Sequence, residues 1–181
     1  MSAILWRRLD RPGHEFASLR RNDSNWLLNG VAVFEHDAQP CNLRYAIVCD
    51  ASFRTVSADV VGCVGSRDVE VTIRVDERTW KMNGETQRGV AGCIDVDLNF
   101  SPSTNLLPIR RLNLPVGEQA RVRAAWLRFP TFHLEPLEQT YRRVAERQFR
   151  YQSASFAADL LVNEDGLPLR YGDIWSADAV I

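Results

Sequence analysis

The sequence is poor in cysteine, and its few cysteines are not spaced as metal ligands. None of the four, Cys41, Cys49, Cys63 and Cys93, forms a C-x-x-C pair or stands at metal-ligand spacing from a histidine. Zinc sites and disulfide frameworks are normally recognised by such regular spacings. We therefore expect small buried hydrophobic side chains at these positions, with no zinc site and no disulfide framework.

Histidines and nucleophile motifs are equally scarce. His14, His36 and His133 lie outside any nucleophile motif, and G-x-S-x-G does not occur. The glycines lack the spacing of a P-loop or of G-x-G-x-x-G. These absences favour a protein that is not an enzyme and needs no cofactor.

Paired carboxylates are present, but their pattern does not indicate a metal site. Asp95 and Asp97 form one pair, and Glu164 and Asp165 form another. Asp97 alternates with apolar neighbours, so we expect both aspartates on the polar face of a strand. The prediction is that no metal is bound.

Lysine is almost absent, since Lys81 is the only one among 22 basic residues, and the net charge is −1. Without a basic excess the sequence predicts no nucleic-acid partner. The predominant arginine binds planar anions through forked hydrogen bonds and stacks on aromatic rings. This bias suits a polar ligand, although a GC-rich coding background produces it equally well.

Long apolar runs are also missing. No stretch approaches the 18 or so apolar residues of a membrane span, and MSAILWRRLD is too short an apolar run for a signal peptide. We expect a cytoplasmic protein without a membrane span. A chain of 181 residues fits one domain, so residues 1–181 are predicted to fold together.

Short strands separated by turns make up most of the chain. Apolar and polar residues alternate over residues 69–75, the clearest half-buried strand. Asn83-Gly84 and Asp165-Gly166 have the composition of hairpin turns. The fold class is therefore mainly β: a curved antiparallel sheet or half-barrel, with a closed barrel as the alternative.

The centre of the chain contains the one predicted helical turn. Ser101-Pro102 is a cap followed by a first-turn proline, which predicts a helical turn over Ser101–Asn105 with Ser101 as its N-cap. Pro108 is expected to stop that helix within about a turn.

Residues 135–151 are ambiguous. Pro136, Leu137 and Tyr141 have helical spacing, whereas Leu137, Gln139 and Tyr141 alternate as in a strand. The surrounding strands favour a hairpin.

Two short segments suggest a duplicated sheet unit. Residues 56–61 are similar to residues 156–161, and each segment precedes a turn, a return strand and a tryptophan, Trp80 and Trp175. Duplication would produce two related curved sheets.

Three longer segments carry a resemblance to a known family. They read DVDLNFSPSTNLLPIRRLNLPVGE, AAWLRFPTFHLEPLEQTYRR and FRYQSASFAADLLVNEDGLPLRYGDIW. Together they resemble the bacterial family of putative glycolipid-binding proteins, over nearly the whole chain. The resemblance implies a strongly curved, mostly antiparallel β fold, similar to lipoprotein-carrier half-barrels, with a groove for an acyl chain. It implies no established catalytic residues.

Arginines interleave with aromatic residues near the central corner. Trp126 and Arg128 share one face of a strand, whereas Arg150 points away from its aromatic neighbours. Apolar walls with a few converging arginines suit an amphipathic ligand. The candidate binding residues are Trp126, Arg128, Arg110, Arg111, Phe129 and Tyr151.

Three functions remain open at this point. The first is non-enzymatic binding of a lipid or glycolipid on the concave face of the sheet. The second is a cytoplasmic small-molecule enzyme that uses the same cavity with an arginine and a carboxylate such as Asp50 or Asp95. The third is a structural or interaction protein whose cavity is simply filled core. The sequence does not indicate an oligomeric state.

Overall fold

A computed structural model describes residues 2–181 and consists mainly of strands. The N-terminal half contains β1 (Ser2–Arg8), β2 (Gly13–Asn22), β3 (Asn25–His36), β4 (Gln39–Cys49), β5 (Thr55–Val64), β6 (Arg67–Asp76), β7 (Thr79–Met82) and β8 (Glu85–Thr86). The C-terminal half contains β9 (Asp95–Leu98), β10 (Gln119–Arg128), β11 (His133–Ala145), β12 (Gln148–Ser153), β13 (Ala157–Val162), β14 (Pro168–Tyr171) and β15 (Trp175–Val180). The helix η1 (Arg88–Val90) precedes β9, and the helices η2 (Ser103–Asn105) and α1 (Leu106–Leu112) lie between β9 and β10.

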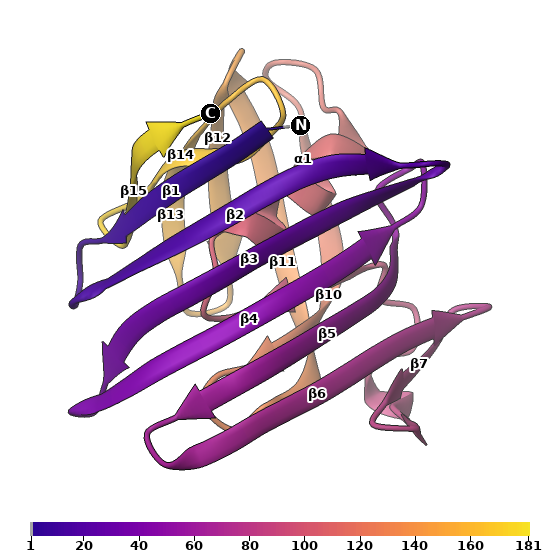
Figure 1. Ribbon diagram of the computed structural model, residues 1–181. Coiled ribbons are helices and arrows are strands. Elements are labelled where there is room, and N and C mark those ends of the chain that lie inside the picture. Colours follow the sequence, from indigo (N-terminus) through magenta and orange to yellow (C-terminus); the bar gives the residue numbers. More distant parts are fainter. Residues whose placement is uncertain (1) are drawn as a thin grey trace.

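All fifteen strands belong to one sheet (Figure 1), in the order β8-β7-β6-β5-β4-β3-β2-β1-β15-β14-β13-β12-β11-β10-β9. Neighbouring strands are antiparallel, except for the parallel pair β9 and β10. The first strand pairs with the last, with Ile4 opposite Val180, and this pairing joins the two halves. The prediction of a curved antiparallel sheet is therefore confirmed.

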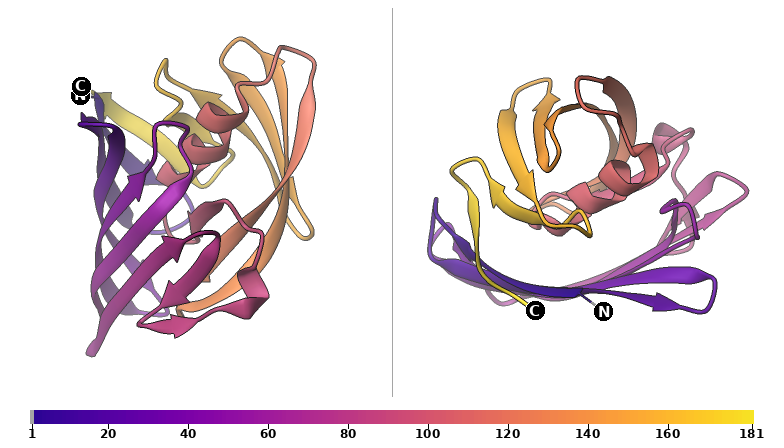
Figure 2. Two further views of the ribbon diagram at one scale, coloured as in Figure 1. Left: turned by 90° about the vertical axis from the view of Figure 1, so that its right-hand side faces the viewer. Right: turned by 90° about the horizontal axis from the view of Figure 1, so that it is seen from above.

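The two halves curve to different extents. Figure 2 shows β1–β6 as a broad, shallow layer, while the C-terminal strands curl tightly around α1. One large apolar core lies between the layers, and it includes Trp6, Ile47 and Leu98. A smaller core around Tyr141 and Tyr151 fills the curl of the C-terminal half. The concave side of the sheet is thus packed with side chains.

The sheet is open, so the alternative of a closed barrel is wrong. Its edges are β8 and β9, which do not pair with each other within residues 2–181. Single contacts join the edge strand β9 to the other half instead. The Thr55 N–H donates to the Ile94 carbonyl (3.2 Å), and the Val96 N–H donates to Thr55 Oγ1 (2.9 Å). Because β9 has only four residues, it offers little backbone for a ladder.

The predicted helical turn is present but longer than expected. A 3-10 turn over Ser103–Asn105 continues into α1, which ends at Leu112 before the left-handed Asn113 (φ 42°). Pro108 is the third residue of α1 and does not stop it. The first four N–H groups of an α-helix lack intrahelical partners, so a proline in this turn removes no hydrogen bond.

Other expectations agree with the structure. Residues 135–151 form the β11–β12 hairpin and contain no helix. Val69, Val71 and Ile73 are buried, while Glu70 and Arg74 are exposed.

The two similar segments lie in β5 and β13, and each begins a three-strand meander that ends on a strand with a tryptophan. An antiparallel meander repeats this arrangement without any duplication, so duplication stays a prediction.

Within the described part of the chain, the only α-helix is the short α1, and no helix has the length and apolar character needed to cross a membrane.

Candidate functional site

A cavity of about 740 Å³ lies at one rim of the sheet. It opens between the end of α1, the loop before β5, and the turns of the β11–β12 and β13–β14 hairpins. Its apolar walls come from Phe53, Ile109, Leu114, Phe149 and Val162. Its charged lining consists of Arg110, Arg111, Arg143, Arg147, Glu146 and Glu164. Both hydrogen-bond donors and acceptors therefore face the same space as two aromatic rings.

The loop before β5 holds Phe53 in an unusual backbone conformation. Asp50 Oδ1 accepts the N–H groups of Ser52 (2.8 Å) and Arg54 (2.9 Å), which closes the loop. Phe53 has φ 61°, a region that bulky residues rarely occupy. Its ring stacks on Trp26 with 5.0 Å between ring centroids. The burial of this stacked ring offsets the backbone cost and fixes one wall of the cavity.

Arg110 covers that aromatic wall. Its guanidinium carbon is 4.9 Å from the centroid of Phe53 and 5.9 Å from that of Trp26. Its nearest carboxylate is Asp165, at 4.0 Å. The side chain is therefore held mainly by cation–π contacts and keeps hydrogen-bonding capacity towards the cavity.

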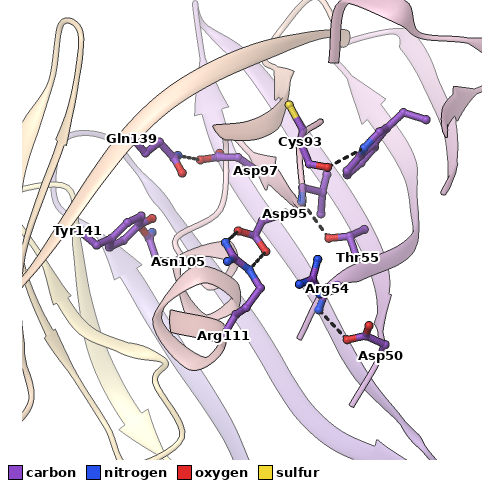
Figure 3. A network of polar contacts seen from close by, with 12 residues as sticks. Asp50, Arg54, Thr55, Cys93, Asp95, Asp97, Asn105, Arg111, Gln139 and Tyr141 are labelled. Atoms are coloured by element: carbon purple, nitrogen blue, oxygen red, sulfur yellow. Dashed lines mark hydrogen bonds and ion pairs between the residues drawn. The ribbon is translucent and has the colours of Figure 1, made fainter. Parts of the chain in front are cut away.

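Arg111, the neighbouring arginine, is fully engaged beneath the cavity. Its Nε donates to Asp95 Oδ1 (3.0 Å) and its Nη2 to Asp95 Oδ2 (2.5 Å), as Figure 3 shows. Asp95 is buried, and burial raises the pKa of its carboxyl group although Arg111 acts in the opposite direction. The pair anchors α1 to β9, and both carboxylate oxygens are occupied.

A second set of polar contacts continues into the C-terminal curl (Figure 3). Gln139 Nε2 donates to Asp97 Oδ2 (2.6 Å). It also donates to the Tyr151 hydroxyl (3.2 Å), and the Tyr141 hydroxyl donates to Asn105 Oδ1 (2.8 Å). Burial raises the pKa of Asp97 to about 6, and the nearby Asp95 acts in the same direction. The two aspartates do share a polar face, but that face lies inside the curl and not in solvent.

Two further arginines come from the β11–β12 hairpin. Arg143 donates to the carbonyl oxygens of Leu114 (2.8 Å) and Glu146 (3.0 and 2.5 Å). Arg147 forms an ion pair with Glu164 at 2.7 Å. Sequence reasoning missed both residues. They reach the cavity only because the hairpin tip meets the end of α1, and no local pattern indicates that contact.

The predicted binding residues are divided by the structure. Arg110 and Arg111 line the cavity, but Trp126 and Arg128 do not. Arg128 is exposed, lies 5.3 Å from the Trp126 ring and pairs with Glu135 at 3.2 Å. These two residues share a face, as expected, but that face lies opposite the buried Leu127.

The two remaining predicted residues are packed into cores. Phe129 makes edge contacts with Phe34, His36 and Phe132, with ring centroids 4.7–5.8 Å apart. Tyr151 is buried against Tyr141 and Phe149 in the smaller core. As predicted, Arg150 points away from its neighbours and pairs with Asp159.

A smaller cavity of about 430 Å³ lies on the other side of the same loop. Asp50, Arg54 and Thr55 line it, whereas Ala51 and Phe53 line the larger one. Its remaining walls are Val75, Arg78, Gly92, Cys93 and Ile94. The loop thus separates a polar cavity from a more apolar one.

The N-cap residue of the 3-10 turn is Pro102 and not Ser101, but the Ser101 hydroxyl still accepts a backbone N–H at the start of the turn, and it belongs to a buried polar cluster around Glu15. This hydroxyl accepts the Ser103 N–H (3.1 Å) and donates to Glu15 Oε1 (2.5 Å), while the Tyr45 hydroxyl lies 2.6 Å from the same oxygen. Burial raises the pKa of Glu15 to about 8. Gly30 makes room for this cluster, since a Cβ there would overlap the Tyr45 ring.

The signal for Glu15 is present in the sequence. It alternates with the buried Ala17 and Leu19, which places a carboxyl group on the apolar face of β2.

Comparison with known proteins identifies relatives of this fold. A family model described as putative glycolipid-binding, formerly DUF1089, matches residues 3–177. A DUF1089 family protein from Pseudomonas aeruginosa, known from its crystal structure, is 30% identical in sequence, with a TM-score of 0.75. The match covers 87% of this chain and 88% of that one. No curated protein matches the chain.

Proposed function

The chain belongs to the putative glycolipid-binding family, and we propose that it binds an amphipathic glycolipid with the sugar head group in the arginine-lined cavity at the rim of the sheet. The observation that carries this proposal is the lining itself. Planar, charged side chains surround a space of about 740 Å³ beside the Phe53 and Phe149 rings. Sugars need in-plane hydrogen bonds around an apolar face, and this lining supplies both.

The position of this site differs from the one expected from the sequence. Two apolar cores fill the concave face, so we place the acyl chain outside it. In this proposal the alkyl tail leaves the polar cavity across the Asp50–Arg54 loop, towards the smaller cavity lined by Val75 and Ile94. Arg110 and Arg111 remain part of the site, whereas Trp126 and Arg128 do not.

The alternative of an enzyme requires a carboxylate that can reach a ligand. Asp95 is turned away from the cavity, with both oxygens bonded to Arg111. Asp50 accepts two backbone N–H groups of its own loop. Because both groups are engaged in holding the fold, neither of the two carboxylates expected for the enzyme alternative is available to a ligand in the cavity.

Calorimetric titration with short-chain glycolipids tests the proposal. Octyl glucoside and octyl glucuronide carry the same tail, and both can be used below their micelle concentrations. We expect saturable binding of at least one of them, and weaker binding of glucose and of octanol, which each lack one half of the ligand.

A substitution that fills the cavity provides a second test of the proposed function. Ser52 is an exposed lining residue, so Ser52→Trp places a ring in the site without disturbing the core. Affinity should fall by about tenfold or more, the usual effect of forcing extra volume into an occupied site. Ser66→Trp, in the exposed β5–β6 turn, is the matched control and should bind like the wild type. Absence of saturable binding for both glycolipids would refute the proposed function.

A further inference from the structure

The arginines of the cavity differ in how their charges are compensated. Arg111 is paired with Asp95, Arg147 with Glu164, and Arg110 has Asp165 at 4.0 Å. Among the residues that the structure describes, Arg143 is the one lining arginine without a carboxylate in ion-pair range. Its partners are the backbone carbonyls of Leu114 and Glu146 and the ring of Phe149, 5.7 Å from the guanidinium carbon.

Carbonyl oxygens orient a guanidinium but do not neutralise it. Three bonds to carbonyls use three of the five N–H groups of Arg143, which leaves two free. The side chain is only partly exposed, so water screens its charge less than that of a surface arginine. A fixed, uncompensated cation at the wall of a cavity favours an anionic group on the ligand.

A second arginine can join Arg143 at little cost. The partner of Arg147 is Glu164, whose side chain is 82% exposed. Exposed ion pairs of this kind contribute little to stability, typically less than about 1 kcal/mol. A ligand anion can therefore replace Glu164 at Arg147, while Arg110 lies across the same space. Within residues 2–181, Glu146 is the one lining carboxylate that forms no ion pair with an arginine, so the lining arginines outnumber the lining carboxylates.

From this arrangement we infer that the cavity selects an acidic head group, a carboxylate or phosphate on the sugar, with Arg143 as its anchor and Arg147 as its second contact. This inference rests on the proposed function and names the class of glycolipid. A planar carboxylate receives two parallel N–H bonds from a guanidinium, which a neutral hydroxyl does not. Arg111 lines the same cavity but does not bind the acidic group, because its Nε and Nη2 are already bonded to Asp95.

The matched pair of octyl glucuronide and octyl glucoside tests this selectivity, because the two differ only in one carboxylate. Hydrogen bonds to charged groups predict that the wild type binds the glucuronide about tenfold more tightly or better. The preference should shrink as salt is raised, since screening weakens charge pairing. Free glucuronate and inorganic phosphate should compete weakly, which separates recognition of the lipid from capture of a free anion. If inorganic phosphate competes as well as the glucuronide does, the site is an anion site and the inference is wrong.

Variants of Arg143 assign the preference to this residue. Arg143→Gln should bring the two affinities together, while Arg143→Lys keeps the charge and should keep part of the preference. Arg150→Gln is the matched control: it lies in the same hairpin, pairs with Asp159 outside the cavity, and should leave the ratio unchanged. If Arg143→Gln fails to fold, Arg147→Gln, which removes only an exposed pair, should still reduce the ratio.

The outcomes separate the two proposals. Equal wild-type affinities for the two glycolipids would overturn the acidic preference and leave the proposed function standing. A preference that survives in both Arg143→Gln and Arg147→Gln would also overturn it. Failure of both ligands to bind would refute the proposed function itself.

Discussion

The two halves of the sheet solve the same packing problem differently. The N-terminal half is a shallow layer with an apolar inner face. The buried carboxyl group of Glu15, whose pKa burial raises to about 8, is an exception on that face. The C-terminal half is tightly curled and places ionised and polar side chains inside, around α1. In the N-terminal half, alternation of apolar and polar residues is enough to fill the inner face. The packing of the C-terminal half depends instead on specific hydrogen-bonded and ion pairs. The cavity lies where the two halves meet.

The largest expected effect comes from breaking the apolar face of the N-terminal half. Val71→Asp would bury an unpaired charge in β6, at a cost of several kcal/mol, and should abolish soluble folding. Val61→Asp makes the same change on the exposed face of the neighbouring strand β5, where the valine is 43% exposed. Soluble yield and circular dichroism should separate the two. A folded Val71→Asp variant would show that the inner face tolerates charge.

In the C-terminal half, the corresponding test removes one partner of a buried pair. Arg111→Met leaves the buried Asp95 carboxylate without the two hydrogen bonds of the Arg111 guanidinium. It should lower the free energy of unfolding by about 3–5 kcal/mol. The double variant Asp95→Leu/Arg111→Met should recover most of this loss, because no charge is then stranded. Arg150→Met breaks an exposed pair and should cost no more than about 1 kcal/mol.

Denaturant unfolding measures all three variants. Equal losses for Arg111→Met and Arg150→Met would mean that the pair beneath the cavity does not organise this half.

The sequence predicted the two halves unequally, for a physical reason. The strand at residues 69–75 and the Asn83-Gly84 turn follow from a period-two pattern and from turn chemistry, which are local, whereas the 135–151 hairpin of the C-terminal half was ambiguous and followed only from the strands around it. The length of α1 did not follow, because proline is tolerated in a first turn. The cavity did not follow either: Arg143 and Phe53 are distant in the chain and meet only through the curl. Their adjacent charges identified Arg110 and Arg111 as candidate binding residues. The sequence did not show that Arg110 covers an aromatic wall while Arg111 pairs with Asp95.

Glu15 is the buried carboxyl group of the otherwise apolar N-terminal half. We expect its substitution to change stability less than Val71→Asp or Arg111→Met does, and in a way that depends on pH. Its folded pKa is about 8, above the ordinary value of 4.5. Between these values the unfolded state releases the proton and the folded state keeps it, so stability falls as pH rises through this window. The slope is about 1.4 kcal/mol per pH unit for one proton. Below pH 4.5 and above about pH 8 this contribution is flat.

The variant Glu15→Gln keeps the shape of the side chain and removes the titration. Its stability relative to wild type should rise by about 3 kcal/mol between pH 5 and pH 7, from two units at that slope. Comparing variant with wild type at each pH cancels the titration of Asp97, which both proteins share. A difference that does not change with pH would mean that Glu15 is ionised in the folded protein. The N-terminal half would then contain a buried charge, as the C-terminal half does, and the contrast between the two would be lost.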